Sequence, residues 1–187
     1  MKYLTILILA ILIPQSPLFF AQNGKTEKFD DWFLPSQDEI AAMDTNLNNE
    51  GVGGFRIDRY WSSSESTSES AHEFEFEFDF GTNNVKTLLC RVRACRSFTA
   101  ASEAYSLRGT GPAGGLIFYI DGTTFYEAAP SDQTSSRDQA WSNVTATLIG
   151  TTGTAIGTGA QNTLDIIGQT SHTSSAAKLC NDLIIYN

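Results

Sequence analysis

Phenylalanine and carboxylate side chains alternate without a break over residues 73–80, which read EFEFEFDF. Successive side chains of a β-strand point to opposite faces of a sheet, so this run predicts a strand with one apolar face and one acidic face. We expect all four phenylalanines to face the core. Such a strand needs a partner, and the turn residues at 81–84 indicate that the next segment returns beside it.

The returning segment is expected at residues 85–98, VKTLLCRVRACRSF. Opposed residues of an antiparallel pair share a face, so the register must keep phenylalanines away from arginines. That register sets these residues opposite each other: Phe78 and Leu88, Phe76 and Cys90, Phe74 and Val92, Glu75 and Arg91, and Glu73 and Arg93. The arginines would then neutralise the carboxylates. A calcium site is the weaker alternative, because a flat row of carboxylates does not converge on one ion.

A helix is predicted to begin at Ser36, because Ser36 and Glu39 form the S-x-x-E capping box that satisfies free backbone N–H groups. Gly51 supplies a left-handed stop after two asparagines. Large aromatic residues on both sides of this short helix need apolar cover from elsewhere in the chain. Apolar residues recur at helical spacing, at Ile40, Met43 and Leu47.

The second half of the chain carries a hairpin and two helices. Residues 114–120, GGLIFYI, predict a buried strand closed by an Asp-Gly turn, with residues 123–129 as the hairpin partner. Asn162 is predicted to cap a helix that continues through Ile167. A second helix is predicted to turn four residues inward: Ala176, Leu179, Cys180 and Leu183.

Seven motifs together indicate a family. They are D-W-F-L-P-S-x-D-E (31–39), Y-W-S-S-S-E (60–65), V-R-A-x-R-x-F (92–98), G-P-A-G-G-L-I-F-Y (111–119), E-A-A-P-S-D-Q (127–133), A-I-G-T-G-A-x-N-T (155–163) and A-A-K-L-C (176–180). The chain resembles the lectin-like family typified by the C-terminal domain of the bacterial collagen-like adhesin Lcl. The resemblance implies an α+β, C-type-lectin-like fold: a mainly antiparallel twisted sheet, two or three short helices and long loops.

The order of the motifs departs from that family. Residues 29–98 look like its C-terminal half and residues 111–187 like its N-terminal half, with 99–110 as a joining linker, so the chain resembles a circular permutant. The alternative is a fragment cut across two tandem copies, which would form a strand-swapped dimer or another homo-oligomer.

An intramolecular permutation has a topological consequence. The strand at 114–120 should pair with or neighbour the strand at 88–98, and Asn187 should end near Phe29.

Residues 1–21 are typical of a secretory signal peptide, with one lysine, an apolar run and then prolines. A retained membrane anchor is the lesser alternative, because the apolar run is too short to span a bilayer. The remaining residues, 22–187, are expected to form a single lectin-like domain that is not inserted in the membrane. We expect it to be secreted, periplasmic or at the cell surface. A formal net charge of −9 argues against nucleic acid as a partner.

Three cysteines leave at least one thiol unpaired within the chain. Cys90 and Cys95 are too far apart on an extended strand to join each other. A Cys90 to Cys180 disulfide is one expectation, and three free thiols packed as small apolar groups are the equal alternative.

The resemblance implies a non-catalytic binding module for a glycan or protein ligand, without metal or cofactor. The negative charge disfavours sulfated glycans, because anionic sugars need cationic partners. One alternative is a structural envelope component. The other is an oxidase-like enzyme, since formylglycine-generating enzymes share a distantly related fold.

Ligand binding is expected on loops carried by the rigid sheet. The first candidate loop is Tyr60, Trp61, Ser62, Ser63, Ser64 and Glu65, whose ring, hydroxyls and carboxylate could contact a sugar or peptide. The alternative is that Trp61 anchors the core. The second candidate surface runs from Ser131 and Asp132 to Trp141. Replacing Ser63 or Glu65 by alanine is expected to weaken binding with little change in melting temperature.

Overall fold

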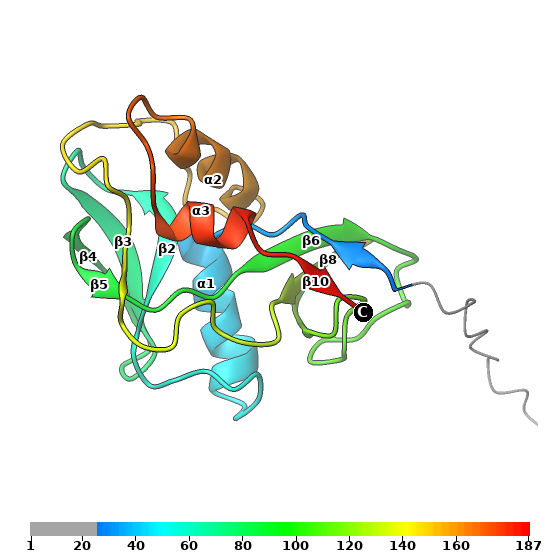
Figure 1. Cartoon of the computed structure of the whole chain (residues 1–187). Helices are drawn as coiled ribbons and strands as arrows, with labels where there is room; N and C mark the ends of the chain where they lie inside the picture. Colours follow the sequence, from blue (N-terminus) through cyan, green and yellow to red (C-terminus); the bar gives the residue numbers. More distant parts are fainter. Residues whose placement is uncertain (1–25) are drawn as a thin grey trace, which may run out of the picture.

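A computed structural model describes residues 26–187, so the predicted signal peptide (1–21) lies outside the described residues. The described chain is α+β, with short helices and four small antiparallel sheets (Figure 1). Within residues 26–187, no helix has the length and apolar character needed to cross a membrane.

The elements follow one another as strands and short helices. The strands are β1 Lys28–Phe29, β2 Arg59–Glu65, β3 Ser70–Glu75, β4 Phe80–Val85, β5 Leu89–Cys90, β6 Cys95–Thr99, β7 Leu116–Asp121, β8 Thr124–Ala128, β9 Gln139–Ala140 and β10 Ile185–Tyr186. The helices are α1 Gln37–Met43, α2 Gly159–Ile167 and α3 Ala176–Asn181, and a π-helical turn, η1 Asp44–Asn48, extends α1.

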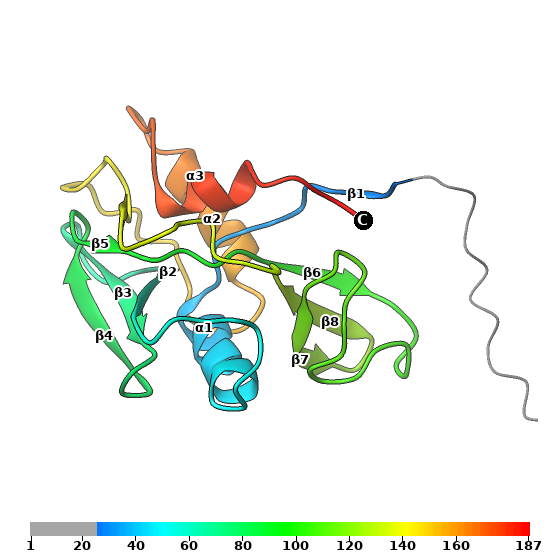
Figure 2. The ribbon, with the colours of Figure 1, turned by 60° about the horizontal axis from the view of Figure 1, so that its bottom comes forward.

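Helix α1 lies between two three-stranded sheets, β2-β3-β4 on one side and β6-β8-β7 on the other (Figure 2). The predicted capping box is confirmed: the Glu39 N–H donates to Ser36 Oγ at 3.3 Å, and the Ser36 N–H donates to Glu39 Oε2 at 2.7 Å. Gly51 has the expected left-handed conformation, with φ +70°. The apolar face of α1 and η1 packs into a cluster with residues of both sheets.

The prediction that residues 73–80 form one strand is wrong. Strand β3 ends at Glu75, a turn covers 76–79, and β4 returns from Phe80 with Ser70 opposite Val85. Phe74 and Phe76 are buried as expected, whereas Phe78 and Phe80 are 60% and 46% exposed.

The predicted pairing with residues 85–98 is also wrong, and so are the pairs Glu75–Arg91 and Glu73–Arg93. Strand β3 is central in its sheet, between β2 and β4. Residues near Arg91 instead run parallel to the far side of β2, where the Trp61 N–H donates to Arg91 O at 3.0 Å. Arg59 of β2 takes the place of the predicted arginines, with Nη2 at 2.6 Å from Glu75 Oε1. Glu73, Phe74 and Glu75 are all buried, so both faces of β3 are covered at this end, and alternation alone does not identify a solvent face.

The hairpin of the second half is confirmed: β7 and β8 pair antiparallel, with Gly122 at φ +58° in the turn. Helix α3 forms where predicted and is capped by Ser175, but it ends at Asn181, so Leu183 lies beyond the helix. The predicted cap of α2 is wrong. The helix begins at Gly159, and Asn162 lies inside it, where its side chain bonds to both backbone groups of Gly153.

The two ends of the described chain lie side by side. Strand β1 pairs with β10, and the Glu27 N–H donates to Asn187 O at 2.8 Å, so Asn187 lies near Phe29 as expected. Residues 114–120 do not pair directly with 88–98. Strands β7 and β6 belong to one sheet, with β8 between them.

Candidate ligand-binding site

The first predicted ligand loop is not a loop. Residues Tyr60 to Ser64 belong to β2 and are completely buried, because β3 and the segment at Arg91 flank the strand and α1 and α2 contact it. The three serines bond to neighbouring segments: Ser62 Oγ donates to His72 O (2.8 Å), Ser64 Oγ donates to Gly153 O (2.8 Å), and Ser63 Oγ accepts from Asn162 Nδ2 (3.1 Å). The prediction of a loop that contacts ligand is therefore wrong, and the hydroxyls stabilise the fold.

Both tryptophans of the predicted surfaces lie in the core. Trp61 Nε1 donates to Gln139 O at 2.9 Å, and Trp141 Nε1 donates to Ser62 O at 2.8 Å. Each indole thereby satisfies its donor while its ring is fully buried. The core-anchor alternative for Trp61 holds, and Trp141 has the same role.

Glu65 forms a buried ion pair. Its Oε1 lies 2.6 Å from Lys86 Nζ, and both side chains are excluded from solvent. Its Oε2 accepts from the N–H groups of Ile149 and Gly150. Lys86 Nζ also lies 4.8 Å from the ring centroid of Trp141. This carboxylate has no surface from which to meet a ligand.

Asp132 is partly accessible, but its oxygens are occupied. It accepts from the Tyr60 hydroxyl (2.9 Å), Arg93 Nε (2.7 Å) and Arg91 Nη1 (3.5 Å). Burial, and then the adjacent Asp132 charge, raise the pKa of Tyr60, so the phenol is the donor. Ser131 is exposed beside it, in a groove of about 330 Å³ floored by Leu179, Leu183 and Ile184.

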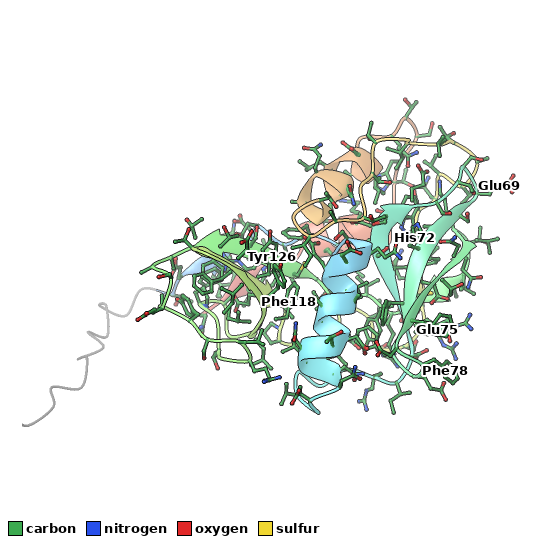
Figure 3. The ribbon with its side chains drawn as sticks, turned by 180° about the vertical axis from the view of Figure 1, so that it is seen from behind. Glu69, His72, Glu75, Phe78, Phe118 and Tyr126 are labelled. Carbon is green, nitrogen blue, oxygen red and sulfur yellow. The ribbon has the colours of Figure 1, made fainter. Side chains whose placement is uncertain are left out.

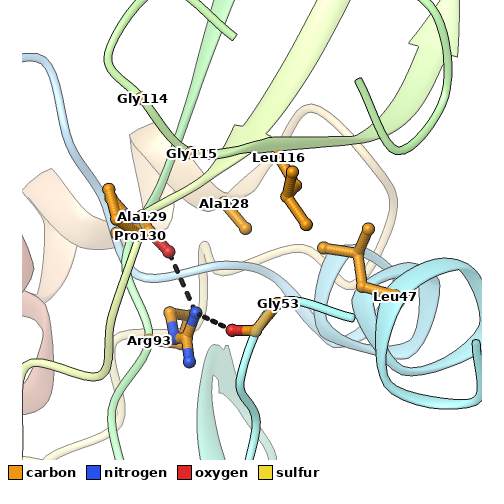
Figure 4. A pocket seen from close by; sticks show the side chains of 9 residues that line it. All are labelled: Leu47, Gly53, Arg93, Gly114, Gly115, Leu116, Ala128, Ala129 and Pro130. Carbon is orange, nitrogen blue, oxygen red and sulfur yellow. Dashed lines mark hydrogen bonds between the residues drawn. The ribbon is translucent and has the colours of Figure 1, made fainter. Parts of the chain in front are cut away.

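A pocket of about 190 Å³ is lined by the residues just before Ser131, Ala128 to Pro130, with Arg93 in its wall (Figure 4). The guanidinium is 1% exposed, and its Nη1 donates to Gly53 O at 3.0 Å and to Ala129 O at 2.9 Å. Phe55 covers it, with the ring centroid 4.1 Å from Cζ. These donors are used within the fold, so the Arg93 pocket offers a ligand mainly apolar contact.

A third hollow, which we name the tip hollow, lies where the β3–β4 turn meets the segment before β2. Its volume is about 170 Å³, and it is lined by Ile57, Asp58, Arg59, Glu75, Glu77, Phe78 and Arg137. Figure 3 shows Phe78 and Glu75 at this end of the hairpin, on the side of α1 away from Phe118 and Tyr126.

The tip hollow combines an exposed ring with polar groups that keep bonding capacity. Arg137 is 55% exposed and uses Nε for Asp58 at 3.0 Å, which leaves its terminal N–H groups for a ligand. Among the described residues, the Glu77 side chain forms no hydrogen bond or ion pair. Donors, acceptors and an aromatic face therefore converge here.

The sequence pattern does not reveal this site, because the alternation at 73–80 predicts that Phe78 faces the core. The only local signal was Asp79, a residue that tolerates a left-handed conformation and here adopts φ +53°. Arg59 and Arg137 are separated widely in the sequence, and no motif joins them.

Behind the hollow, Glu73 carries a buried carboxyl group with an unsatisfied oxygen. Oε1 accepts from Asn84 Nδ2 at 3.0 Å, Arg59 Nε lies 3.8 Å away, and Oε2 has no hydrogen-bond partner among the described residues. Burial raises the pKa of Glu73, and the Asn84 hydrogen bond and the Arg59 charge oppose that rise only in part.

We therefore expect Glu73→Gln to gain stability relative to the native protein as the pH rises. A carboxyl group with a raised pKa in the folded state stabilises the fold at low pH and loses that contribution as the pH rises through the folded pKa. Melting temperatures of both proteins between pH 4 and pH 8 test this. Glu75→Gln is the matched control, because its carboxylate is paired with Arg59 and its removal should bring no such gain. A difference in melting temperature between Glu73→Gln and the native protein that stays the same at every pH would contradict the prediction.

The three cysteines are separate buried thiols, so the predicted Cys90 to Cys180 disulfide is wrong and the alternative of free thiols holds. Burial raises the pKa of all three. A raised pKa disfavours the thiolate, which is the nucleophilic and metal-binding form.

Comparison with known proteins adds no assignment to this site. No protein-family model matches the chain, and neither the search of curated proteins nor the search of solved structures gives a significant match.

Proposed function

We propose that this chain is an exported, non-catalytic binding module of the C-type-lectin-like kind, and that it binds a neutral glycan at the tip hollow. The observation that carries the proposal is the exposed Phe78 ring beside Arg137 and Glu77, whose polar groups keep bonding capacity. The wider proposal, of a lectin-like fold and export, rests on the seven sequence motifs and on the signal-like residues 1–21.

A neutral sugar suits the chemistry of the lining. Sugar hydroxyls both donate and accept, and the apolar face of a sugar ring can pack on an aromatic side chain. Two arginines and three carboxylates line the hollow, a formal excess of one negative charge. This balance, on a chain of net charge −9, disfavours sulfated ligands.

A protein ligand is the second candidate. Phe78, Phe80 and Ile57 are 60%, 46% and 73% exposed, and the rings of Phe78 and Phe80 lie 6.2 Å apart. Exposed apolar side chains that gather at one end of a molecule are typical of interaction surfaces.

The non-catalytic assignment draws support from the buried thiols. A copper-dependent oxidase related to formylglycine-generating enzymes would need accessible thiolates, whereas burial disfavours that form here. The other alternative to a binding module is a structural component of the cell envelope. Ligand arrays distinguish the two.

The permutation is part of the proposal. Pairing of β1 with β10 closes the chain within one molecule, and β6 of the first segment joins β8 and β7 of the second in one sheet. These contacts favour an intramolecular permutant over a fragment that needs a second copy.

Glycan and protein arrays, probed with the purified protein, test the proposed function. Phe78→Ala should weaken binding to any hit by about tenfold, about 1.4 kcal/mol, because it removes the aromatic face on which a sugar ring or an apolar side chain can pack. Tyr186→Ala is the matched control. This aromatic residue is 62% exposed on β10 and does not line the tip hollow, so its replacement should leave the affinity unchanged. Equal affinity of the Phe78→Ala and native proteins would move the site elsewhere, and an absence of hits would favour the structural role.

A further inference from the structure

The two three-stranded sheets have four edge strands, and one of these edges is open. The other three hydrogen-bond to another segment of the chain, through these residue pairs: Trp61 and Arg91 at β2, Cys95 and Phe33 at β6, and Ile117 and Gly109 at β7. Strand β4 is the fourth edge and has no such pairing within residues 26–187. Figure 2 shows β4 at the outer margin of the molecule, with no described helix or strand beyond it.

The hydrogen bonds between β3 and β4 show which backbone groups of β4 face outward. The Lys86 N–H, directly after the strand, donates to Glu69 O at 2.9 Å. Hydrogen-bonded and non-hydrogen-bonded pairs alternate along an antiparallel ladder, so Gly81, Asn83 and Val85 direct their backbone groups away from β3. Among the described residues, both backbone groups of Gly81 and of Asn83 and the N–H of Val85 have no partner.

Strand β4 lacks the features that usually protect an edge strand. Residues 80–85, FGTNNV, contain no charged residue and no proline, and the ladder with β3 has no bulge. Gly81 and Asn83 are exposed, and so are the apolar side chains at the two ends, Phe80 at 46% and Val85 at 54%. An open edge of this kind is a template for an added strand.

We propose that the β4 edge binds an extended, basic segment of a partner protein, which joins the sheet as a fourth strand. The backbone of an extended peptide matches a row of alternating donors and acceptors. Side chains of the added strand would pack on Phe80 on one face of the sheet and on Val85 on the other, because successive residues of a strand point to opposite faces. Strand β4 does not line the tip hollow, so this inference does not rest on the proposed function.

The charges around the edge favour a basic partner. Three exposed carboxylates flank β4: Glu77 and Asp79 before it, and Glu69 beside its far end. The nearest cation in sequence, Lys86, is buried and paired with Glu65, and the two arginines of the tip hollow are each paired with a carboxylate. Lysine or arginine residues of the added strand would therefore meet a negative potential that attracts them.

A second copy of this chain is a poorer occupant of the edge. Antiparallel pairing of two β4 strands brings the beginning of one strand beside the end of the other. Glu77 and Asp79 of one copy would then lie near Glu69 of the other, and each chain has a formal net charge of −9. Repulsion between like charges opposes this pairing.

Peptide display tests the proposal. A phage library of random short peptides is panned on the purified protein, and the enriched peptides are synthesised for calorimetry. We expect peptides with net positive charge and no proline. Asn83→Pro should weaken their binding by about tenfold or more, since proline removes an outward N–H and its ring obstructs the approaching strand. Asn83→Ala is the matched control, because it keeps the N–H and should leave the affinity unchanged.

Neither substitution removes a hydrogen bond of the β3–β4 ladder, because the backbone groups of Asn83 face away from β3, and melting temperatures check that both variants fold. Amide hydrogen exchange of the native protein needs no variant. Bound peptide should slow the exchange of Gly81 and Asn83 and leave that of Ile117, on the paired edge β7, unchanged.

Four results would overturn the proposal. They are an absence of enriched peptides, enriched peptides that are acidic, equal affinities of Asn83→Pro and Asn83→Ala, and no slowing of exchange at Gly81 and Asn83. Sedimentation of the protein without peptide tests the rival occupant. A concentration-dependent dimer that Asn83→Pro abolishes would assign the edge to a second copy of the chain instead.

Discussion

Glu65→Ala is expected to destabilise the protein by about 3–5 kcal/mol, because it leaves the Lys86 ammonium buried without its partner. The two side chains are 1% and 0% exposed, and within residues 26–187 the one further hydrogen-bond acceptor of Lys86 Nζ is Thr147 O at 3.3 Å. The substitution also removes the acceptor for two backbone N–H groups. This reverses the expectation from the sequence, in which Glu65 was a surface residue that affects only binding.

Chemical denaturation measures the loss, and two further variants interpret it. The double variant Glu65→Gln with Lys86→Met keeps an acceptor for the backbone and removes both charges, so it should be more stable than Glu65→Ala. Glu69→Ala, an exposed carboxylate four residues along the chain, should change stability by no more than about 0.5 kcal/mol. A loss below about 1 kcal/mol for Glu65→Ala would mean that water reaches Lys86.

Local patterns predicted the elements that local chemistry controls. The capping box at Ser36 and Glu39 needs only a few consecutive residues, and it formed as expected. The Asp-Gly turn between β7 and β8 is also local, since Gly122 accepts the left-handed conformation that the turn requires.

Long-range pairing was not predictable in the same way. The alternation at 73–80 is compatible with strands that end at different residues and pair with different partners. Arg59, rather than the predicted Arg91 and Arg93, lies beside the carboxylates of Glu73 and Glu75. Strand β3 ends where Phe76 packs into the core. The Phe76 ring centroid lies 4.5 Å from that of Tyr60 and 5.2 Å from that of Phe55. Those contacts come from another part of the chain.

The prediction of a ligand-binding loop at residues 60–65 was wrong for a related reason. A serine-rich run beside a tryptophan has a loop-like composition, but its hydroxyls can equally bond to the backbone of segments packed around a buried strand. Asn162, which donates to Ser63, and Gly153, which accepts from Ser64, lie about 90 to 100 residues away in sequence. Composition contains no information about such partners. The tip hollow needed the same information, because Arg137 reaches Asp58 from the other half of the chain.

Arg93→Ala is expected to cost about 3–5 kcal/mol, because this single guanidinium holds its own segment to two others, at residues 53–54 and 129–132. Its Nε is 2.7 Å from Asp132 Oδ1, and its Nη1 donates to Gly53 O and Ala129 O. Truncation would leave a largely buried carboxylate short of a cation and two carbonyl groups without a donor. Arg93→Lys should recover little of the stability lost in Arg93→Ala, since one ammonium group cannot reach all the acceptors that the planar guanidinium reaches.

Arg91→Ala is the matched control, two residues away on the same segment. Arg91 is more exposed, and its partners keep other cations: Asp58 retains Arg137, and Asp132 retains Arg93. We expect a loss of about 1 kcal/mol or less, measured by the same denaturation. The contrast tests how the two halves of the chain are joined. If Arg93→Ala costs no more than Arg91→Ala, the segment at Asp132 is held by its backbone contacts, such as the Gln133 N–H to Val92 O bond at 2.8 Å. A much larger loss of stability for Arg93→Ala would show that the buried guanidinium holds the segment at Asp132 in place.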